Sequence, residues 1–150
     1  MSKSISLYKQ LANHKLFNKT INFNLTRIKL VLKKLNHPEK KLKNVINFLG
    51  SSGKFTTLNS IKSFIEANNQ TATAYISPSL KDIKERFWMG ERYLAHQEIK
   101  QSIKLIEEIK VPLTIFEVLT VIYIMNASKF PQASQSFVKA TWTFKSVNKP

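Results

Sequence analysis

The sequence predicts an α/β fold, in which a parallel sheet is flanked by helices. Two short apolar segments, at residues 45–49 and 71–76, have the composition of buried strands. Between them lie a turn with two glycines and a segment whose apolar residues recur at helical spacing up to about residue 68. A strand, a helix and a second strand within about 30 residues form a βαβ unit, whose strands normally run parallel.

The segment upstream of the first strand predicts a helix. Asn24 can cap this helix, and apolar residues recur at helical spacing from Leu25 to Leu35. The helix must end before the His37-Pro38 pair, because proline disfavours helical geometry in the residue that precedes it.

Downstream of the second strand, residues 86–89 are compatible with a short strand or an ordered loop. Isoleucines at positions 99, 103 and 106 indicate an amphipathic helix that ends before Pro112. A last helix opens at Thr114 and extends to about Ala127. Because this helix is apolar on nearly every side, we expect it to pack against the sheet.

Residues 132–150 have a different pattern, in which apolar and polar residues alternate from Val138 to Lys145. This alternation is typical of a strand buried on one face only and is unsuited to the interior of a parallel sheet. We therefore expect an edge strand or a tail there. The predicted organisation is a domain at residues 1–131 and a divergent tail at residues 132–150.

The chain is strongly basic, with 24 Lys and Arg against 9 Asp and Glu and a formal net charge of +15. Such a charge suits a polyanionic partner, so a small basic nucleic-acid-binding protein is one possible function. However, 21 of the 24 cations are lysines, whereas recognition of base edges and phosphates favours arginine. A biased amino-acid composition is therefore the favoured explanation of the charge, and a nucleic-acid role stays open as the alternative.

Several classes are excluded or disfavoured by composition. The chain has no cysteine, which excludes disulfide scaffolds, cysteine-based zinc sites and thiol nucleophiles. No apolar run reaches the ~18 residues needed to span a bilayer, and the N-terminus lacks the pattern of a signal peptide. We expect a cytoplasmic, monomeric protein with no membrane partner.

The glycine turn, Gly50-Ser-Ser-Gly-Lys-Phe-Thr-Thr57, is the strongest candidate site. A loop that leaves a strand and enters a helix directs backbone N–H groups and the positive end of the helix dipole at one point, which suits a phosphate. Lys54 can supply a charge to the phosphates, and Thr56 can reach Mg²⁺. Phe48 and Phe55 depart from the standard phosphate-loop pattern, so an ordinary strand-to-helix turn is the alternative.

The turn resembles the G-T-N-G-K-G-S/T-T phosphate loop of the folylpolyglutamate synthase/dihydrofolate synthase family, which is related to the Mur ligases. Further segments resemble motifs of that family in the same order. Residues 21–28 (I-N-F-N-L-T-R-I) are similar to I-D-L-G-L-E-R-I, and residues 75–80 (Y-I-S-P-S-L) to Y-T-S-P-H-L. Residues 85–87 (E-R-F) are similar to E-R-I, and residues 114–120 (T-I-F-E-V-L-T) to T-x-F-E-V-L-T.

The resemblance implies a P-loop NTPase-like sheet of the Mur ligase central-domain type. It implies an ATP-dependent ligase that activates a pteroate or folate carboxylate as an acyl phosphate and joins it to glutamate through an amide bond. The residues that would hold ATP are Gly50, Ser51, Ser52, Gly53, Lys54 and Thr56. Ser77 and Thr56 would contact Mg²⁺, and the pteroate pocket would be lined by Ile21, Asn22, Phe23, Thr114, Ile115, Phe116 and Glu117.

The sequence also departs from the family pattern. Phe55 stands where the family has a glycine, Asn22 where it has an aspartate, and Ser79 where it has a histidine. The family continues with an E-V-G-L-G-G-R strand that bears a Mg²⁺-binding glutamate, then a histidine ligand and a glutamate-binding domain, and none of these is recognisable here. We therefore expect the N-terminal part of an ATP-binding ligase domain, truncated or diverged, that binds Mg·ATP weakly and lacks complete ligase activity. A nonfunctional remnant is a further possibility.

Thr114 and Glu117 also have a purely structural interpretation. A threonine followed three residues later by a glutamate forms a capping box, in which the two side chains bond to the first backbone N–H groups of a helix. One residue pair can both cap a helix and line a pocket, so the two roles are compatible.

Overall fold

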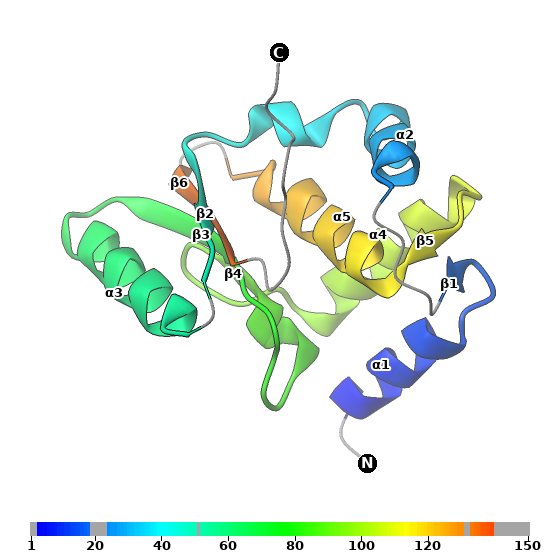
Figure 1. Cartoon of the computed structure of the whole chain (residues 1–150), viewed down its shortest axis with the longest axis horizontal. Coiled ribbons are helices and arrows are strands. Elements are labelled where there is room, and N and C mark those ends of the chain that lie inside the picture. The colour runs from blue at the N-terminus through cyan, green and yellow to red at the C-terminus, as the bar shows by residue number, and fades with distance from the viewer. Residues whose placement is uncertain (1–2, 19–23, 51, 131–132, 140–150) are drawn as a thin grey trace.

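The structure, a computed structural model, describes residues 3–18, 24–50, 52–130 and 133–139. The α-helices of this part are α1 (Lys3–Asn13), α2 (Thr26–Lys34), α3 (Lys54–Ala67), α4 (His96–Glu108) and α5 (Ile115–Ala127). The strands are β1 (Phe17–Asn18), β2 (Val45–Phe48), β3 (Thr71–Tyr75), β4 (Phe87–Met89), β5 (Leu113–Thr114) and β6 (Ala133–Lys139). Two 3-10 turns, η1 (Pro38–Lys41) and η2 (Ile83–Arg86), complete the order shown in Figure 1.

The main sheet has four strands in the order β2-β6-β3-β4. β6 pairs in parallel with both β2 and β3, whereas β4 pairs with β3 in antiparallel orientation. The α/β class is confirmed, and the expected parallel sheet forms only in part: β2, β6 and β3 run parallel, whereas β4 returns antiparallel beside β3 without a crossover helix. A second, two-stranded sheet pairs β1 with β5 in parallel.

The expectation of an edge strand or tail after residue 131 is wrong for residues 133–139. These residues form β6, which lies between β2 and β3 rather than at an edge. Alternation of apolar and polar residues indicates which face of a strand is apolar. It does not indicate which strands lie beside it, because these depend on where the chain enters the sheet after helix α5. The remainder of the expected tail, residues 140–150, lies outside the described residues.

The strand expected at residues 45–49 forms as β2, but its predicted burial is wrong. Val45, Ile46 and Asn47 are exposed, and Phe48 is the buried residue of the strand. Among the described strands, β2 lies at one edge of the sheet, so its apolar side chains are covered less than those of β3.

β3 is buried on both faces, and its side chains alternate between two cores. Ala72, Ala74 and Ile76 pack with Phe48 and with Leu58 of α3. Tyr75 instead belongs to the larger core around α5, where its ring stacks on Tyr123 at 5.5 Å between centroids. Figure 1 shows α3 on one side of the sheet and α5 on the other. This two-sided covering explains why β3 has no exposed residue.

Helix α5 is the centre of the larger core, as its all-round apolar sequence predicts. Seven of its apolar residues are buried: Val118, Leu119, Val121, Ile122, Tyr123, Met125 and Ala127. The hydroxyl groups of Tyr123 and Thr73 are hydrogen-bonded at 3.0 Å, which satisfies both polar atoms beneath the sheet. α5 therefore attaches the sheet to α2 and α4.

Helices α2 and α4 agree with their predicted ranges, whereas α1 is a helix that the sequence patterns above do not predict. α2 ends at Lys34, before Pro38, and the side-chain oxygen of Asn24 accepts a hydrogen bond from the backbone N–H of Thr26 at 2.9 Å. α4 contains the isoleucines of the predicted amphipathic face, of which Ile99 and Ile106 are almost completely buried. In the described part of the chain, no helix has the length and apolar character required to cross a membrane.

Candidate functional site

The carboxyl ends of β2 and β3 lie at the same edge of the sheet. Asn47 of β2 and Tyr75 of β3 both pair with Val138 of β6, so the two outer strands are level with each other. Two strand spacings separate them by roughly 10 Å. Gly50 follows Asn47 by three residues and Ser77 follows Tyr75 by two, which places both just beyond this edge. In open α/β sheets, ligands bind outside the carboxyl ends of parallel strands.

The glycine turn makes a sharp entry into α3. Gly53 has a φ of 74°, in the left-handed region that favours glycine, and its carbonyl oxygen accepts a hydrogen bond from Thr57 N at 2.9 Å. The side chain of Lys54 turns back over the loop, and its ammonium group donates to the carbonyl oxygen of Gly50. The N-terminus of a 14-residue helix therefore points toward the edge where β2 ends.

The structure brings together the described members of the predicted ATP-binding set. Gly50, Ser52, Gly53 and Thr56 are exposed, and Lys54 is half-buried. Ser51 lies outside the described residues. Phe55, which departs from the family pattern, is 47% exposed at the start of α3, so its ring is largely in solvent rather than packed into the core.

Ser77 is buried and takes part in a polar network that the motif comparison does not reveal. Its Oγ accepts a hydrogen bond from Arg86 Nη1 at 2.8 Å. Arg86 Nε donates to the hydroxyl of Tyr8 on α1 at 2.5 Å, and that hydroxyl lies 3.1 Å from Ser79 Oγ. Arg86 is itself only 7% exposed. The E-R pair in the sequence is the signal that could have pointed to this arginine.

The loop between Ser77 and Arg86 is organised by Glu85. The carboxylate accepts hydrogen bonds from the backbone N–H groups of Leu80 at 2.7 Å and Lys81 at 3.1 Å. The backbone donors of Lys81 and Leu80 lower the pKa of Glu85 below its ordinary value. Tyr75, at the end of β3, has a pKa raised by burial, against the opposing effect of Arg86. Its phenol therefore stays protonated at neutral pH.

The residues at this edge of the sheet fit a metal ion that binds together with nucleotide phosphates. They fit less well a metal ion that is coordinated by protein side chains alone. Among the described residues, no group of three or more His, Asp or Glu side chains is arranged to hold a metal. Hydroxyl oxygens such as those of Ser77 and Thr56 are acceptable Mg²⁺ ligands, but Mg²⁺ usually takes most of its ligands from water and substrate phosphates. The bond from Arg86 leaves Ser77 Oγ one lone pair free for such a contact.

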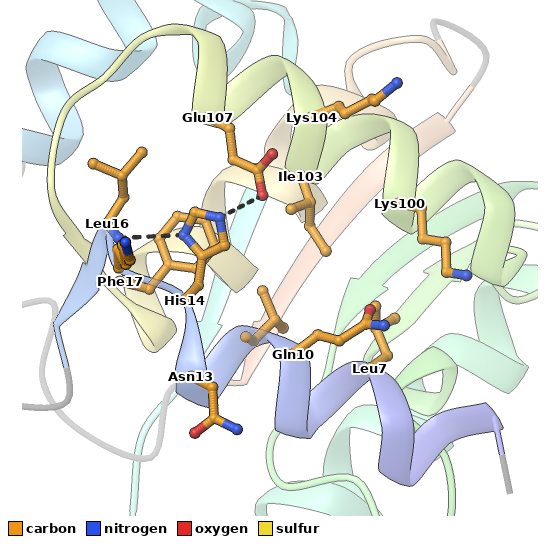
Figure 2. Close-up of a pocket in the computed structure, with 12 residues that line it drawn as sticks. Leu7, Gln10, Asn13, His14, Leu16, Phe17, Lys100, Ile103, Lys104 and Glu107 are labelled. Atoms are coloured by element: carbon orange, nitrogen blue, oxygen red, sulfur yellow. Dashed lines mark hydrogen bonds and ion pairs between the residues drawn. The ribbon is translucent and has the colours of Figure 1, made fainter.

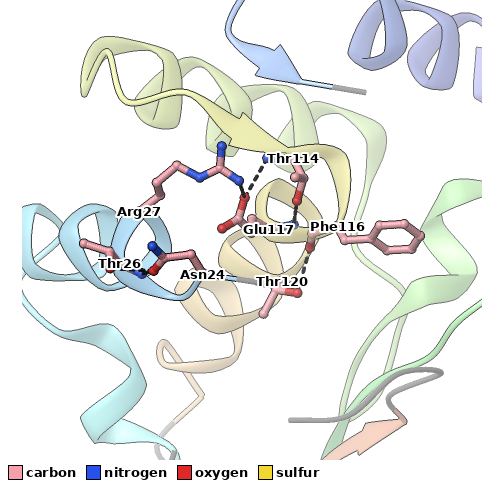
Figure 3. A network of polar contacts seen from close by, with 7 residues as sticks. All are labelled: Asn24, Thr26, Arg27, Thr114, Phe116, Glu117 and Thr120. Carbon is pink, nitrogen blue, oxygen red and sulfur yellow. Dashed lines mark hydrogen bonds and ion pairs between the residues drawn. The ribbon is translucent and has the colours of Figure 1, made fainter. Parts of the chain in front are cut away.

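The start of α2 lies beside the predicted pteroate segment 114–117 at the start of α5, as Figure 3 shows. Arg27 of α2 contacts Glu117 of α5, with Nη2 and Oε2 separated by 3.2 Å. Arg27, in the described part of the segment 21–28, is therefore adjacent to the segment of residues 114–120. Ile21, Asn22 and Phe23 themselves lie outside the described residues.

The predicted capping box at Thr114 is confirmed. Thr114 Oγ1 accepts from Glu117 N at 3.2 Å, and Glu117 Oε2 accepts from Thr114 N at 2.7 Å. Thr114 and Glu117 are both buried, Ile115 is half-buried, and Phe116 is 53% exposed. Within the described part of the chain, Glu117 Oε1 and Arg27 Nε are buried without a hydrogen-bond partner. Glu117 Oε1 can therefore accept, and Arg27 Nε can donate, a further hydrogen bond with a ligand or with the rest of the chain.

Comparison with solved structures identifies folate enzymes as structural relatives. Escherichia coli FolC in complex with DHPP and ADP is 28% identical over 92% of this chain, with a TM-score of 0.78. A bifunctional folylpolyglutamate synthase/dihydrofolate synthase from Yersinia pestis, with AMPPNP and Mn ion, is 23% identical over 93%, with a TM-score of 0.78. Folylpolyglutamate synthase from Thermotoga maritima is 20% identical over 92%, with a TM-score of 0.74.

The match covers 33% of the length of each of these three proteins, so the chain spans about one third of its structural relatives. No protein-family model matches the sequence, and no curated protein matches it significantly. The resemblance to the folylpolyglutamate synthase/dihydrofolate synthase family is confirmed at the level of structure.

Proposed function

We propose that this chain, whose structural relatives are folylpolyglutamate synthases, is the ATP-binding part of an amide ligase that joins glutamate to a pteroate or folate. The observation that carries the proposal is the convergence of the glycine turn and Ser77 at one edge of the sheet, in a fold shared with FolC. We include β6 in this ATP-binding part together with residues 1–131, since it lies between β2 and β3. No observation in the described part of the chain favours the nucleic-acid alternative.

The nucleotide would bind with its phosphates at the start of α3. Backbone N–H groups of the turn and the positive end of the helix dipole would face the phosphates. Lys54 would exchange its bond to the Gly50 carbonyl for a bond to a phosphate oxygen. Ser51 and Ser52 would contribute hydroxyl donors, and Gly50 and Gly53 would allow the backbone to approach the phosphates.

A magnesium ion bound with the nucleotide would neutralise charge on the phosphates. Ser77 and Thr56 are the residues that would contact this ion through their hydroxyl oxygens. Arg86 would hold the Ser77 side chain in place through its 2.8 Å hydrogen bond.

The reaction implied by the family has two steps. A carboxylate oxygen of the pteroate or folate attacks the γ-phosphorus of ATP, which forms an acyl phosphate and releases ADP. The amine of glutamate then attacks the acyl carbon, which forms the amide, loses a proton and releases phosphate. We assign to this chain the binding of ATP and the stabilisation of charge on the transferred phosphoryl group by Lys54 and the turn. We assign the addition of glutamate to no described residue.

The pteroate would bind beside the start of α5. The segments 21–23 and 114–117 would line its pocket, and the half-buried Arg27 with its buried partner Glu117 would form the wall where α2 meets α5. Phe116, which is largely exposed, could stack on an aromatic ring system.

Titration calorimetry with Mg·ATP tests the proposal. We expect Lys54→Ala to weaken binding about tenfold or more, because a charge-assisted bond to phosphate is lost. Lys29→Ala, an exposed lysine of α2, is the matched control and should leave the affinity unchanged. Equal heats for the wild type and Lys54→Ala, or no heat from either, would contradict the assignment of ATP binding to this turn.

A further inference from the structure

A groove of about 790 Å³ lies between α1 and α4, as Figure 2 shows. The groove is lined by the side chains of Leu7, Gln10 and Leu11 on α1 and by those of Lys100, Ile103 and Lys104 on α4. None of these residues belongs to the ATP-binding edge or to the pteroate segments. Its volume is within the range of small-molecule sites.

The floor of the groove is apolar. Leu7, Leu11 and Phe17 are each 2% exposed, and Ile103 is 9% exposed. All four belong to the larger core, so the floor is a fixed surface of packed side chains rather than a mobile loop. An apolar chain that lies along this floor would be removed from water, which favours binding.

One end of the groove is closed by His14 and Glu107. His14 Nε2 lies 2.9 Å from Glu107 Oε1, and this bond crosses from the end of α1 to α4. His14 Nδ1 accepts a hydrogen bond from Leu16 N at 3.3 Å, so the ring proton lies on Nε2, which donates to Glu107. The imidazole also stacks on Phe17, with 4.3 Å between ring centroids.

The rim of the groove is positively charged. Lys15, Lys100 and Lys104 are exposed around it, and Glu107 is the acid that lines it. Lys100 and Lys104 stand one turn apart on the same face of α4. Because the three lysines outnumber the single carboxylate, the rim attracts an anion.

We infer that this groove binds a small amphiphilic anion, an unbranched apolar chain that ends in a carboxylate. The chain lies over Leu7, Leu11 and Ile103 toward the closed end, and the carboxylate contacts Lys100 and Lys104 at the rim. The groove volume of about 790 Å³ accommodates a chain of medium length. This inference is independent of the proposed ATP binding, because it uses other residues.

Calorimetric titration of the full chain with dodecanoate, below the concentration at which it forms micelles, tests the inference. We expect one-to-one binding of dodecanoate. Dodecanol, which lacks the charge, and dodecyltrimethylammonium, which reverses it, should bind at least about tenfold more weakly. Equal binding of all three compounds would overturn the inference, because the lysines would then not discriminate between an anionic, a neutral and a cationic head group. Absence of dodecanoate binding would overturn it as well.

Two variants locate the binding in the groove. Lys104→Glu should weaken dodecanoate binding about five- to tenfold, because an exposed attraction becomes a repulsion. Lys29→Glu on α2 changes the net charge by the same amount and should have no effect. Gln10→Trp, at an exposed position of α1, should fill the groove and abolish binding while the melting temperature is retained. Equal losses from Lys104→Glu and Lys29→Glu, or full binding by Gln10→Trp, would overturn the assignment.

The oligomeric state at increasing protein concentration distinguishes a different occupant. A dimer that Gln10→Trp disrupts, together with no binding of dodecanoate, would assign the groove to a second copy of the chain and overturn the inference. A monomer at all concentrations, together with one-to-one dodecanoate binding, supports it.

Discussion

At the scale of single residues, backbone conformation decides where glycine is required. Gly53 has a φ of 74°, but a Cβ atom added there would meet nothing within 4 Å. Gly90 has a φ of 94°, and an added Cβ would lie 2.4 Å from Cγ2 of Thr71. A residue other than glycine would therefore have a strained backbone at either position. At position 90 its Cβ would in addition clash with Thr71.

We expect Gly90→Ala to lower the free energy of unfolding by about 2–3 kcal/mol and Gly53→Ala by about 1 kcal/mol. Denaturant unfolding followed by circular dichroism measures both values. The double variant Gly90→Ala/Thr71→Ser removes the clashing methyl group and should recover part of the loss. If it recovers nothing, the clash with Thr71 is not the cause.

Glu117 combines two roles at the residue scale, since it caps α5 and pairs with Arg27. We expect Glu117→Ala to cost about 2–4 kcal/mol of unfolding free energy, because the cap is lost and Arg27 is left with an uncompensated charge. Glu117→Gln retains an oxygen acceptor for Thr114 N and should cost less. Chemical denaturation of both variants measures the difference, and equal costs would show that the cap contributes little.

At the scale of elements, the start of α4 is stabilised by a carboxylate. Glu98 accepts from Ala95 N at 2.8 Å and from Arg92 Nη1 at 2.7 Å. The hydrogen bond from Arg92 lowers the pKa of Glu98 to about 2, from an ordinary value of 4.5. A lowered pKa in the folded state means that the charged form contributes stability above about pH 4.5 and that this contribution is lost as the pH falls toward 2.

We therefore expect the wild type to lose stability between pH 4.5 and pH 2 more steeply than Glu98→Gln. The difference should be at most about 1 kcal/mol, because the pair is partly exposed and screened by water. Melting temperatures across this pH range measure it, with the exposed Glu91→Gln as the control. Parallel pH profiles for the wild type and Glu98→Gln would contradict this role.

The elements also show how far local pattern predicts structure. Helical spacing and capping residues predict α2, α3, α4 and α5, because the signals for a helix lie within its own sequence. The central position of β6 and the edge position of β2 are not predictable in this way. Strand order depends on contacts between segments that are about 90 residues apart along the chain, such as Val45 and Ser136.

At the scale of the whole molecule, the candidate site is assembled from segments far apart in sequence. Motif resemblance predicts that residues 21–28 and 114–120 belong together, and the contact between Arg27 and Glu117 agrees with this. The network that joins Tyr8 of α1 to Arg86 and Ser77 is not predictable, because it depends on how α1 packs beside η2. Each of these two networks includes a residue that the family resemblance names as a site residue, Glu117 in the first and Ser77 in the second.

The net positive charge of the chain matters for the proposed function mainly through a few lysines at particular positions. The chain carries a net +15, yet the proposed phosphate contact needs one lysine, Lys54, at the start of one helix. The remaining lysines include those around the groove between α1 and α4, where their position beside an apolar floor matters more than their number.

The proposed function requires that ATP binds where β2 and β3 end. A titration of the ¹⁵N-labelled chain with Mg·ATP, followed by NMR, locates the binding residue by residue. We expect the largest shifts of backbone amide signals at Gly50, Gly53, Lys54 and Thr56, with smaller shifts at Ser77. Shifts confined to α1 and α4, or no shifts at all at saturating nucleotide, would contradict the claim.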